Sequence, residues 1–103
     1  MVKVIYGGGK DYHKFFKFIK NGKELMTIPF NNSYGASYGD SFYHDFVKQF
    51  KAVVGINKLD PSKEYSISEQ NLIKLALEYM AKHKRSKYRF YLKNLIKILK
   101  SGG

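Results

Sequence analysis

The dipeptide Asn21-Gly22 is a strong signal for a β-hairpin turn. A type I′ turn needs positive φ at both central residues, and Asn and Gly adopt that conformation at little cost. The runs on either side, residues 12–20 and 23–30, are rich in aromatic, aliphatic and lysine side chains. We therefore predict two antiparallel strands joined by a two-residue hairpin turn.

The turn also predicts the register, because a two-residue loop places Lys20 opposite Lys23. Counting back along both strands gives two faces. The first would hold Lys20, Phe18, Phe16 and Lys14 opposite Lys23, Leu25, Thr27 and Pro29. The second would hold His13, Phe15, Lys17 and Ile19 together with Glu24, Met26, Ile28 and Phe30. Because the second face has the larger aliphatic cluster, and Lys17 could reach Glu24 diagonally, we expect it to form the core.

The first face suggests a function. Phe16 and Phe18 would lie there among three lysines, and aromatic rings surrounded by cations suit base stacking combined with phosphate attraction. Tyr12 is a further stacking candidate. The alternative is a sheet between helices, in which both phenylalanines are buried and the lysine stems reach outward to water. The sequence leaves both possibilities open.

Other local signals predict one more strand and a helix. Residues 2–6 are apolar and β-branched and end at three glycines, which is typical of a strand followed by a turn. Apolar residues at helical spacing predict a helix over 42–54, capped by Gly55. Ser37 with Asp40 resembles a capping box before that helix.

The C-terminal third predicts two further helices. Ser66 or Ser68 would cap the first, and Glu69 completes a capping-box pattern with Ser66. The expected buried stripe is Leu72, Leu75, Ala76, Tyr79 and Met80. Apolar periodicity pauses over 82–89 and then resumes, so we expect a turn near Ser86 and a second helix beyond it. One continuous, kinked helix is the alternative.

These elements indicate a single α+β domain, in which a small antiparallel sheet of two to three strands packs against about three helices. The expected parts are a β-rich segment 1–30, a loop 31–40, a helix 41–55, a connector 56–67 and a helical part 68–100. A chain of 103 residues has room for one hydrophobic core.

Charge is distributed unevenly along the chain. There are 19 Lys and Arg against 8 Asp and Glu, a net charge of +11 at pH 7, and the last acidic residue is Glu78. The cations that follow it are Lys82, Lys84, Arg85, Lys87, Arg89, Lys93, Lys97 and Lys100. Such a surplus repels itself unless an anionic partner offsets it, and nucleic acid, either DNA or RNA, is the first candidate. Because lysines outnumber arginines, which supply most bidentate contacts to guanine, we expect low sequence specificity.

The predicted nucleic-acid contacts combine the hairpin with the segment between the last two helices. They are Lys14, Phe16, Phe18, Lys20, Lys23, Lys84, Arg85, Lys87 and Arg89. In this interpretation the cations bind phosphates and the phenylalanines stack on bases. A helix-turn-helix is disfavoured, because residues 88–99 are apolar around much of the helix and a recognition helix needs a polar outer face.

Several classes of protein are disfavoured. The sequence has no cysteine, which excludes disulfides and thiolate metal sites. His13, His44 and His83 lack metal-ligand spacing, so we expect no metal and no cofactor. No apolar run approaches the roughly 20 residues of a membrane span, and residues 1–10 do not resemble a secretory signal. We therefore expect a cytoplasmic protein without a membrane span.

One family resemblance covers less than half of the chain. The run from Gly9 to His13, a strand, a turn, "TIPF" at 27–30, a glycine-containing loop and the helix "FVKQFKAVVGI" resemble the central part of HicA-type toxins. Those toxins are small basic ribonucleases with a core similar to double-stranded-RNA-binding domains. The resemblance implies that His13 is the catalytic residue.

Three functions follow as hypotheses. Nucleic-acid binding without catalysis is favoured. The second is a HicA-like endoribonuclease that uses His13 as its acid or base. The third is a small interaction protein, phage-borne or otherwise carried by a mobile element, that docks on an acidic protein or a ribonucleoprotein and regulates it.

Overall fold

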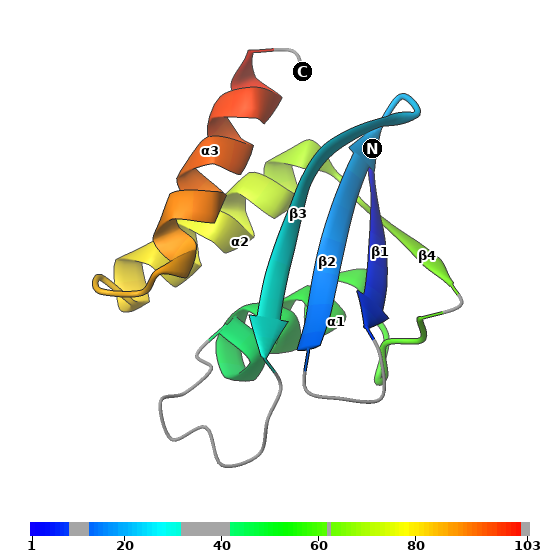
Figure 1. The fold of residues 1–103 in the computed structure, drawn as a ribbon, viewed down its shortest axis with the longest axis horizontal. Coiled ribbons are helices and arrows are strands. Elements are labelled where there is room, and N and C mark those ends of the chain that lie inside the picture. The colour runs from blue at the N-terminus through cyan, green and yellow to red at the C-terminus, as the bar shows by residue number, and fades with distance from the viewer. Residues whose placement is uncertain (9–12, 32–41, 62, 102–103) are drawn as a thin grey trace.

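The described residues form a four-stranded antiparallel sheet with helical elements on one side of it (Figure 1). The computed structural model describes residues 1–8, 13–31, 42–61 and 63–101. The strands are β1 (Val2–Gly8), β2 (His13–Lys20), β3 (Lys23–Asn31) and β4 (Glu64–Ile67), in the spatial order β3-β2-β1-β4. The helical elements are the π-helical segment η1 (Phe42–Val47), α1 (Lys48–Val54), α2 (Glu69–Lys82) and α3 (Tyr88–Lys100). The predicted α+β class is confirmed.

Strand β4 differs from the sequence prediction, which assigns residues 56–67 to a connector. Its residues pair with β1, where Val2 lies opposite Ile67 and Val4 opposite Tyr65. Four residues give too short an alternation to be recognised as a strand, and it is the pairing with β1 that stabilises this one. The sheet of the described residues therefore has four strands, whereas the sequence predicts two to three.

The hairpin turn is confirmed. Asn21 and Gly22 have φ of 53° and 76°, and Lys20 lies opposite Lys23. The register beyond the turn is different from the predicted one, because a β-bulge shifts the pairing between Phe18 and Ile19. The pairs are Ile19 with Glu24, Phe18 with Met26, Phe16 with Ile28 and Lys14 with Phe30.

The bulge decides which side chains are buried. An extra residue in one strand reverses the alternation beyond it, so the apolar residues of β3 move to the face that carries Phe16 and Phe18. Phe16, Phe18 and Ile28 are all 0% exposed, and Phe30 is 4% exposed. The prediction that Phe15, Lys17 and Ile19 face the core is therefore wrong, whereas Ile28 and Phe30 are buried as expected.

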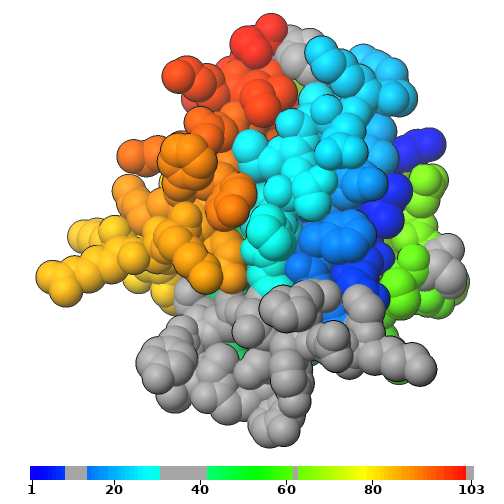
Figure 2. Space-filling model, viewed as in Figure 1, coloured from blue at the N-terminus to red at the C-terminus, as the bar shows by residue number. Residues whose placement is uncertain are grey.

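The opposite face of the sheet is open (Figures 1 and 2). In Figure 2, strands β1 to β3, coloured blue to cyan, reach the surface beside α3, coloured orange and red. The Phe15 ring lies directly on Gly7, where an added Cβ would be 2.3 Å from the ring atom Cζ. Two ion pairs of 3.7 Å, Lys17 with Glu24 and Lys3 with Glu64, balance the charge of this face.

Most helical predictions are confirmed. Phe42, Phe46 and Phe50 are buried, and Gly55 caps α1 with a φ of 77°. The capping box of Ser37 and Asp40 lies outside the described residues. Helix α2 begins after Ser68, whose Oγ accepts the Asn71 N–H at 3.1 Å. Ser66, the other candidate cap, lies in β4 and does not cap the helix. The expected apolar stripe of α2 is buried. Among the described residues, none of the helices has the length and hydropathy of a membrane span.

The corrected faces of β2 make a stability prediction. Phe16→Ala should lower the free energy of unfolding by about 3–5 kcal/mol, because it opens a cavity in the core. Phe15→Ala removes a partly buried ring from the open face and should cost about 1 kcal/mol. Urea denaturation measures both, with Phe16→Leu as a milder variant if Phe16→Ala does not fold. A larger loss at Phe15 than at Phe16 would contradict the register.

Candidate functional site

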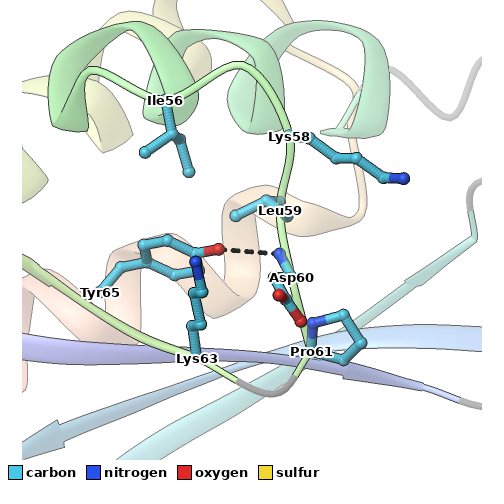
Figure 3. A pocket seen from close by; sticks show the side chains of 7 residues that line it. All are labelled: Ile56, Lys58, Leu59, Asp60, Pro61, Lys63 and Tyr65. Carbon is cyan, nitrogen blue, oxygen red and sulfur yellow. Dashed lines mark hydrogen bonds between the residues drawn. The ribbon is translucent and has the colours of Figure 1, made fainter.

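A cavity of about 470 Å³ opens beside β4 (Figure 3). Its lining residues are Ile56, Lys58, Leu59, Asp60, Pro61, Lys63 and Tyr65. Across it, the Tyr65 hydroxyl accepts the Asp60 N–H at 2.8 Å, which ties the connector to the strand. Because β3 and β4 are opposite edges of the sheet and α3 contacts β3, this cavity is separate from the surface described next.

The connection between α2 and α3 presents a group of cations, which we call the basic turn. It consists of the exposed residues Lys82, Lys84, Arg85 and Lys87. His83 and Ser86, which alternate with them, are partly buried. The predicted turn near Ser86 is thus confirmed, and the cations point to solvent while the residues between them anchor the backbone.

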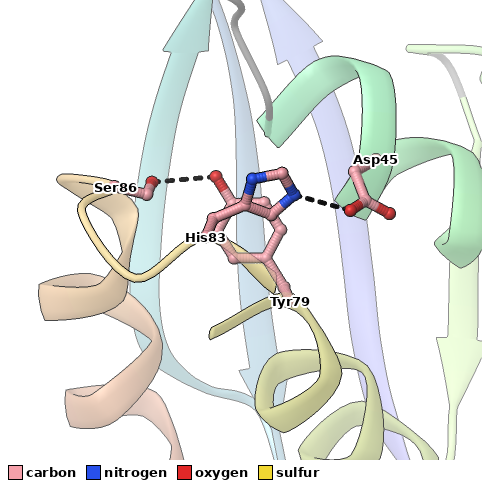
Figure 4. A network of polar contacts seen from close by, with 4 residues as sticks. All are labelled: Asp45, Tyr79, His83 and Ser86. Atoms are coloured by element: carbon pink, nitrogen blue, oxygen red, sulfur yellow. Dashed lines mark hydrogen bonds and ion pairs between the residues drawn. The ribbon is translucent and has the colours of Figure 1, made fainter. Parts of the chain in front are cut away.

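Ser86 holds the basic turn to the core (Figure 4). Its Oγ lies 2.8 Å from the Tyr79 hydroxyl and accepts the Tyr88 N–H at 3.1 Å. Tyr79 and Tyr88 are only 2% and 4% exposed. One hydroxyl therefore links the end of α2 to the start of α3 through two buried tyrosines.

His83 and Arg89 fix the same connection from two other sides. His83 Nε2 lies 2.7 Å from Asp45 Oδ2 in η1, and its ring contacts the Tyr79 ring at a centroid distance of 4.4 Å (Figure 4). Arg89 Nη1 donates a hydrogen bond of 2.5 Å to the Met80 carbonyl at the end of α2. Arg89, predicted to contact phosphate, thus has a structural partner within the fold.

The outer face of α3 continues the cationic surface. Lys93, Lys97 and Lys100 are exposed there, and Phe90 is 69% exposed among them. The buried face of the helix consists of Tyr88, Leu92, Leu95 and Leu99. Phe90 is not among the residues predicted from the sequence to contact nucleic acid. Its position three residues before Lys93 and seven before Lys97 indicates, by helical spacing, that it shares a face with both lysines.

The hairpin residues of the predicted site do not join the basic turn. Lys20 and Lys23 lie at the tip of the hairpin, near the start of α2, and the 14 residues of α2 span about 20 Å from there to the turn. Lys14 is at the other end of β2, opposite Phe30. The lysines of the predicted set are therefore spread over three places, of which the basic turn is one. Figure 1 shows the separation of the elements that carry them.

Three residues of the predicted site, Phe16, Phe18 and Lys20, make other contacts within the fold. Phe16 and Phe18 have no exposed surface, so neither can stack on a base, and the alternative of buried phenylalanines is the correct one. Lys20 forms an ion pair with Glu69. The hydrogen bond from the Lys20 ammonium lowers the pKa of the Glu69 carboxyl, so the charge of this lysine is already partly compensated.

His13 and Tyr12 are the remaining candidate residues from the sequence. His13 is the first residue of β2 and pairs with Asn31, and the catalytic role implied by the HicA resemblance stays a prediction. Tyr12 lies outside the described residues. Within the described part of the chain, no group of three or more His, Asp or Glu side chains could hold a metal ion.

Comparisons of the chain with protein-family models, curated proteins and solved structures found no significant match. The basic turn and the outer face of α3 are therefore the features from which we infer a function.

The anchoring role of Ser86 can be tested by truncation. Ser86→Ala removes the oxygen that bonds to Tyr79 and to the Tyr88 N–H, and should lower the free energy of unfolding by about 1–2 kcal/mol. Amide hydrogen exchange should accelerate across the basic turn. The control is Ser66→Ala, an exposed serine in β4, which should change stability by less than about 0.5 kcal/mol. Equal effects of the two variants would contradict the anchoring role.

The ion pair at the hairpin predicts a pKa change. In Lys20→Gln, the pKa of Glu69 should rise toward its ordinary value of 4.5, as followed by NMR titration of the carboxyl. A lowered pKa stabilises the fold above the unfolded-state value, and this contribution is lost as the pH falls through the folded-state pKa. Lys23→Gln, at the same hairpin tip, should leave the pKa lowered. An unchanged pKa in Lys20→Gln would contradict the pairing.

Proposed function

We propose that this protein binds nucleic acid, and that the basic turn and the outer face of α3 contact the phosphate backbone with low sequence specificity. The observation that supports this most directly is an excess of unpaired charge. In the described part of the chain, no lysine or arginine of residues 82–100 forms an ion pair with a carboxylate. The chain has no acidic residue beyond Glu78 that could provide one locally.

A polyanion would relieve this excess. Each cation that contacts a phosphate releases condensed counterions from the nucleic acid, so affinity would fall steeply with salt. Ser86, His83 and Arg89 anchor the turn, so the backbone that carries the cations is already ordered. This lowers the conformational-entropy cost of binding. Lysines act as point charges without the planar fork of arginine, which favours contacts to phosphates over base readout.

A salt titration with charge variants tests the proposal. The slope of log affinity against log salt should be about −0.7 per phosphate contact on single strands and −0.9 on B-DNA. If all three side chains contact phosphate, the triple variant Lys84→Gln, Arg85→Gln, Lys87→Gln should reduce the slope by about 2 to 3 units. The matched control, Lys51→Gln, Lys58→Gln, Lys63→Gln, removes the same charge near α1 and the Figure 3 cavity.

Two results would contradict the proposal. The first is no binding to DNA or RNA, single- or double-stranded, at about 50 mM salt, where phosphate contacts are strong. The second is the same loss of slope in both triple variants, which would indicate net charge in place of a defined surface. If RNA is shortened in the titration, and His13→Ala abolishes the cleavage, the protein is a ribonuclease as the family resemblance implies.

A further inference from the structure

Phe90 is an exposed aromatic ring in a cationic surrounding. The other large hydrophobic side chains exposed in the described residues are Met1, Val53 and Leu77, none of them aromatic. A single exposed hydrophobic side chain is ordinary on a protein surface. Phe90 suggests a binding site because exposed lysines neighbour it along α3.

Residues three, four and seven positions apart lie on one face of an α-helix. Counted from Phe90, these positions are Lys87, Lys93, Asn94 and Lys97. The three lysines are exposed, and Asn94 is partly buried. Lys93, Asn94 and Lys97 of α3 therefore share a helix face with the Phe90 ring, and no carboxylate lies on the helix. Lys87 is the residue before α3, and its ammonium lies 5.4 Å from the centroid of the Tyr88 ring.

The ring is supported from one side. Tyr91 contacts Phe90 in an edge-to-face arrangement, with ring centroids 6.0 Å apart and planes at 74°. Tyr91 in turn lies 6.4 Å from the ring of Tyr88, which is buried. This row of aromatic residues extends from the core to the surface, and Phe90 at its end still has more than two thirds of its surface exposed to solvent.

On the basis of the proposed function, we propose that Phe90 stacks on a nucleic-acid base while Lys93 and Lys97 contact the adjacent phosphates, so that the preferred ligand is single-stranded. Proteins that bind single strands combine cations that follow the backbone with aromatic rings on which bases stack. In a duplex the bases already stack on each other, and exposing one to a protein ring requires unstacking. Phe90 therefore distinguishes a single strand from a duplex, whereas the lysines do not.

The open face of the sheet is the weaker candidate for the same ligand. It also carries a ring, Phe15, with Lys17 at 6.0 Å from the ring centroid. Lys17 and Lys3 are paired with Glu24 and Glu64, so that face has little net attraction for phosphates. A second copy of this chain is disfavoured as the occupant of the Phe90 face, because both copies would bring lysines to the contact.

Phe90→Ala tests the stacking. On a single-stranded oligonucleotide the affinity should fall by roughly 5- to 150-fold, which corresponds to about 1–3 kcal/mol per stacked base. On an abasic oligonucleotide of the same length, and on a duplex, the affinity should be unchanged. The salt slope should also be unchanged, because no cation is removed, whereas Lys93→Gln with Lys97→Gln should reduce it by about 1.4 on a single strand. Leu77→Ala, an exposed apolar residue on α2, is the matched control and should have no effect.

Phe90→Trp gives a direct optical readout, because the chain contains no other tryptophan. Its emission should be quenched by the single-stranded oligonucleotide and not by the abasic one. Phe90 is exposed, so its variants should keep the unfolding temperature of the unaltered chain.

The outcomes separate the two proposals. If the unaltered chain binds and the Lys84, Arg85 and Lys87 triple variant loses salt slope, but Phe90→Ala binds all three ligands normally, the stacking inference is wrong and the proposed function stands. Equal losses on the abasic and base-containing oligonucleotides would also overturn the stacking inference. If the unaltered chain binds none of them, both proposals are wrong.

Discussion

The packing of the Phe16 ring joins the sheet to the helical layer. The centroid of this ring lies within 5.2–6.4 Å of six other rings, which come from the sheet and from the helical layer: Tyr6, Phe18, Phe30, Phe42, Phe46 and Phe50. From Phe42 the aromatic contacts continue to Tyr79 and Tyr88, which hold Ser86. The packing of the core thus extends to the basic turn, and a surface of cations is presented by a backbone that core contacts keep in place.

The distribution of carboxylates distinguishes the cations of the C-terminal segment from three lysines of the sheet. Glu24, Glu64 and Glu69 are paired with lysines of the sheet, and Asp45 is paired with His83. The two exposed pairs, Lys3 with Glu64 and Lys17 with Glu24, contribute little to stability, but they reduce the local positive field of the sheet. The lysines and arginines of residues 82–100 have no such partners among the described residues, and α3 carries no carboxylate, so we infer that the basic turn and α3 keep a concentrated positive charge.

Local signals in the sequence predict the hairpin turn, the helices and the Gly55 cap, because each depends on neighbouring residues. The bulge beside Leu25 is not local: it places Ile28 and Phe30 beside Phe16, and only the three-dimensional fit of the core favours it. For that reason the predicted stacking face of the hairpin is buried. The run of cations after Glu78 predicts that the basic turn and α3 share a charged surface. The separation of Lys14, Lys20 and Lys23 from that surface follows only from the arrangement of the strands and helices.

NMR mapping of the bound surface would show where a nucleic acid contacts the protein. Short single-stranded DNA would be added at about 50 mM salt to the isotope-labelled protein, and amide shifts followed for every assigned residue. We expect shift changes concentrated in the basic turn and along the outer face of α3, with Lys3, Phe15 and Lys17 on the open sheet face unaffected. Changes concentrated on the sheet face, or none anywhere, would contradict it.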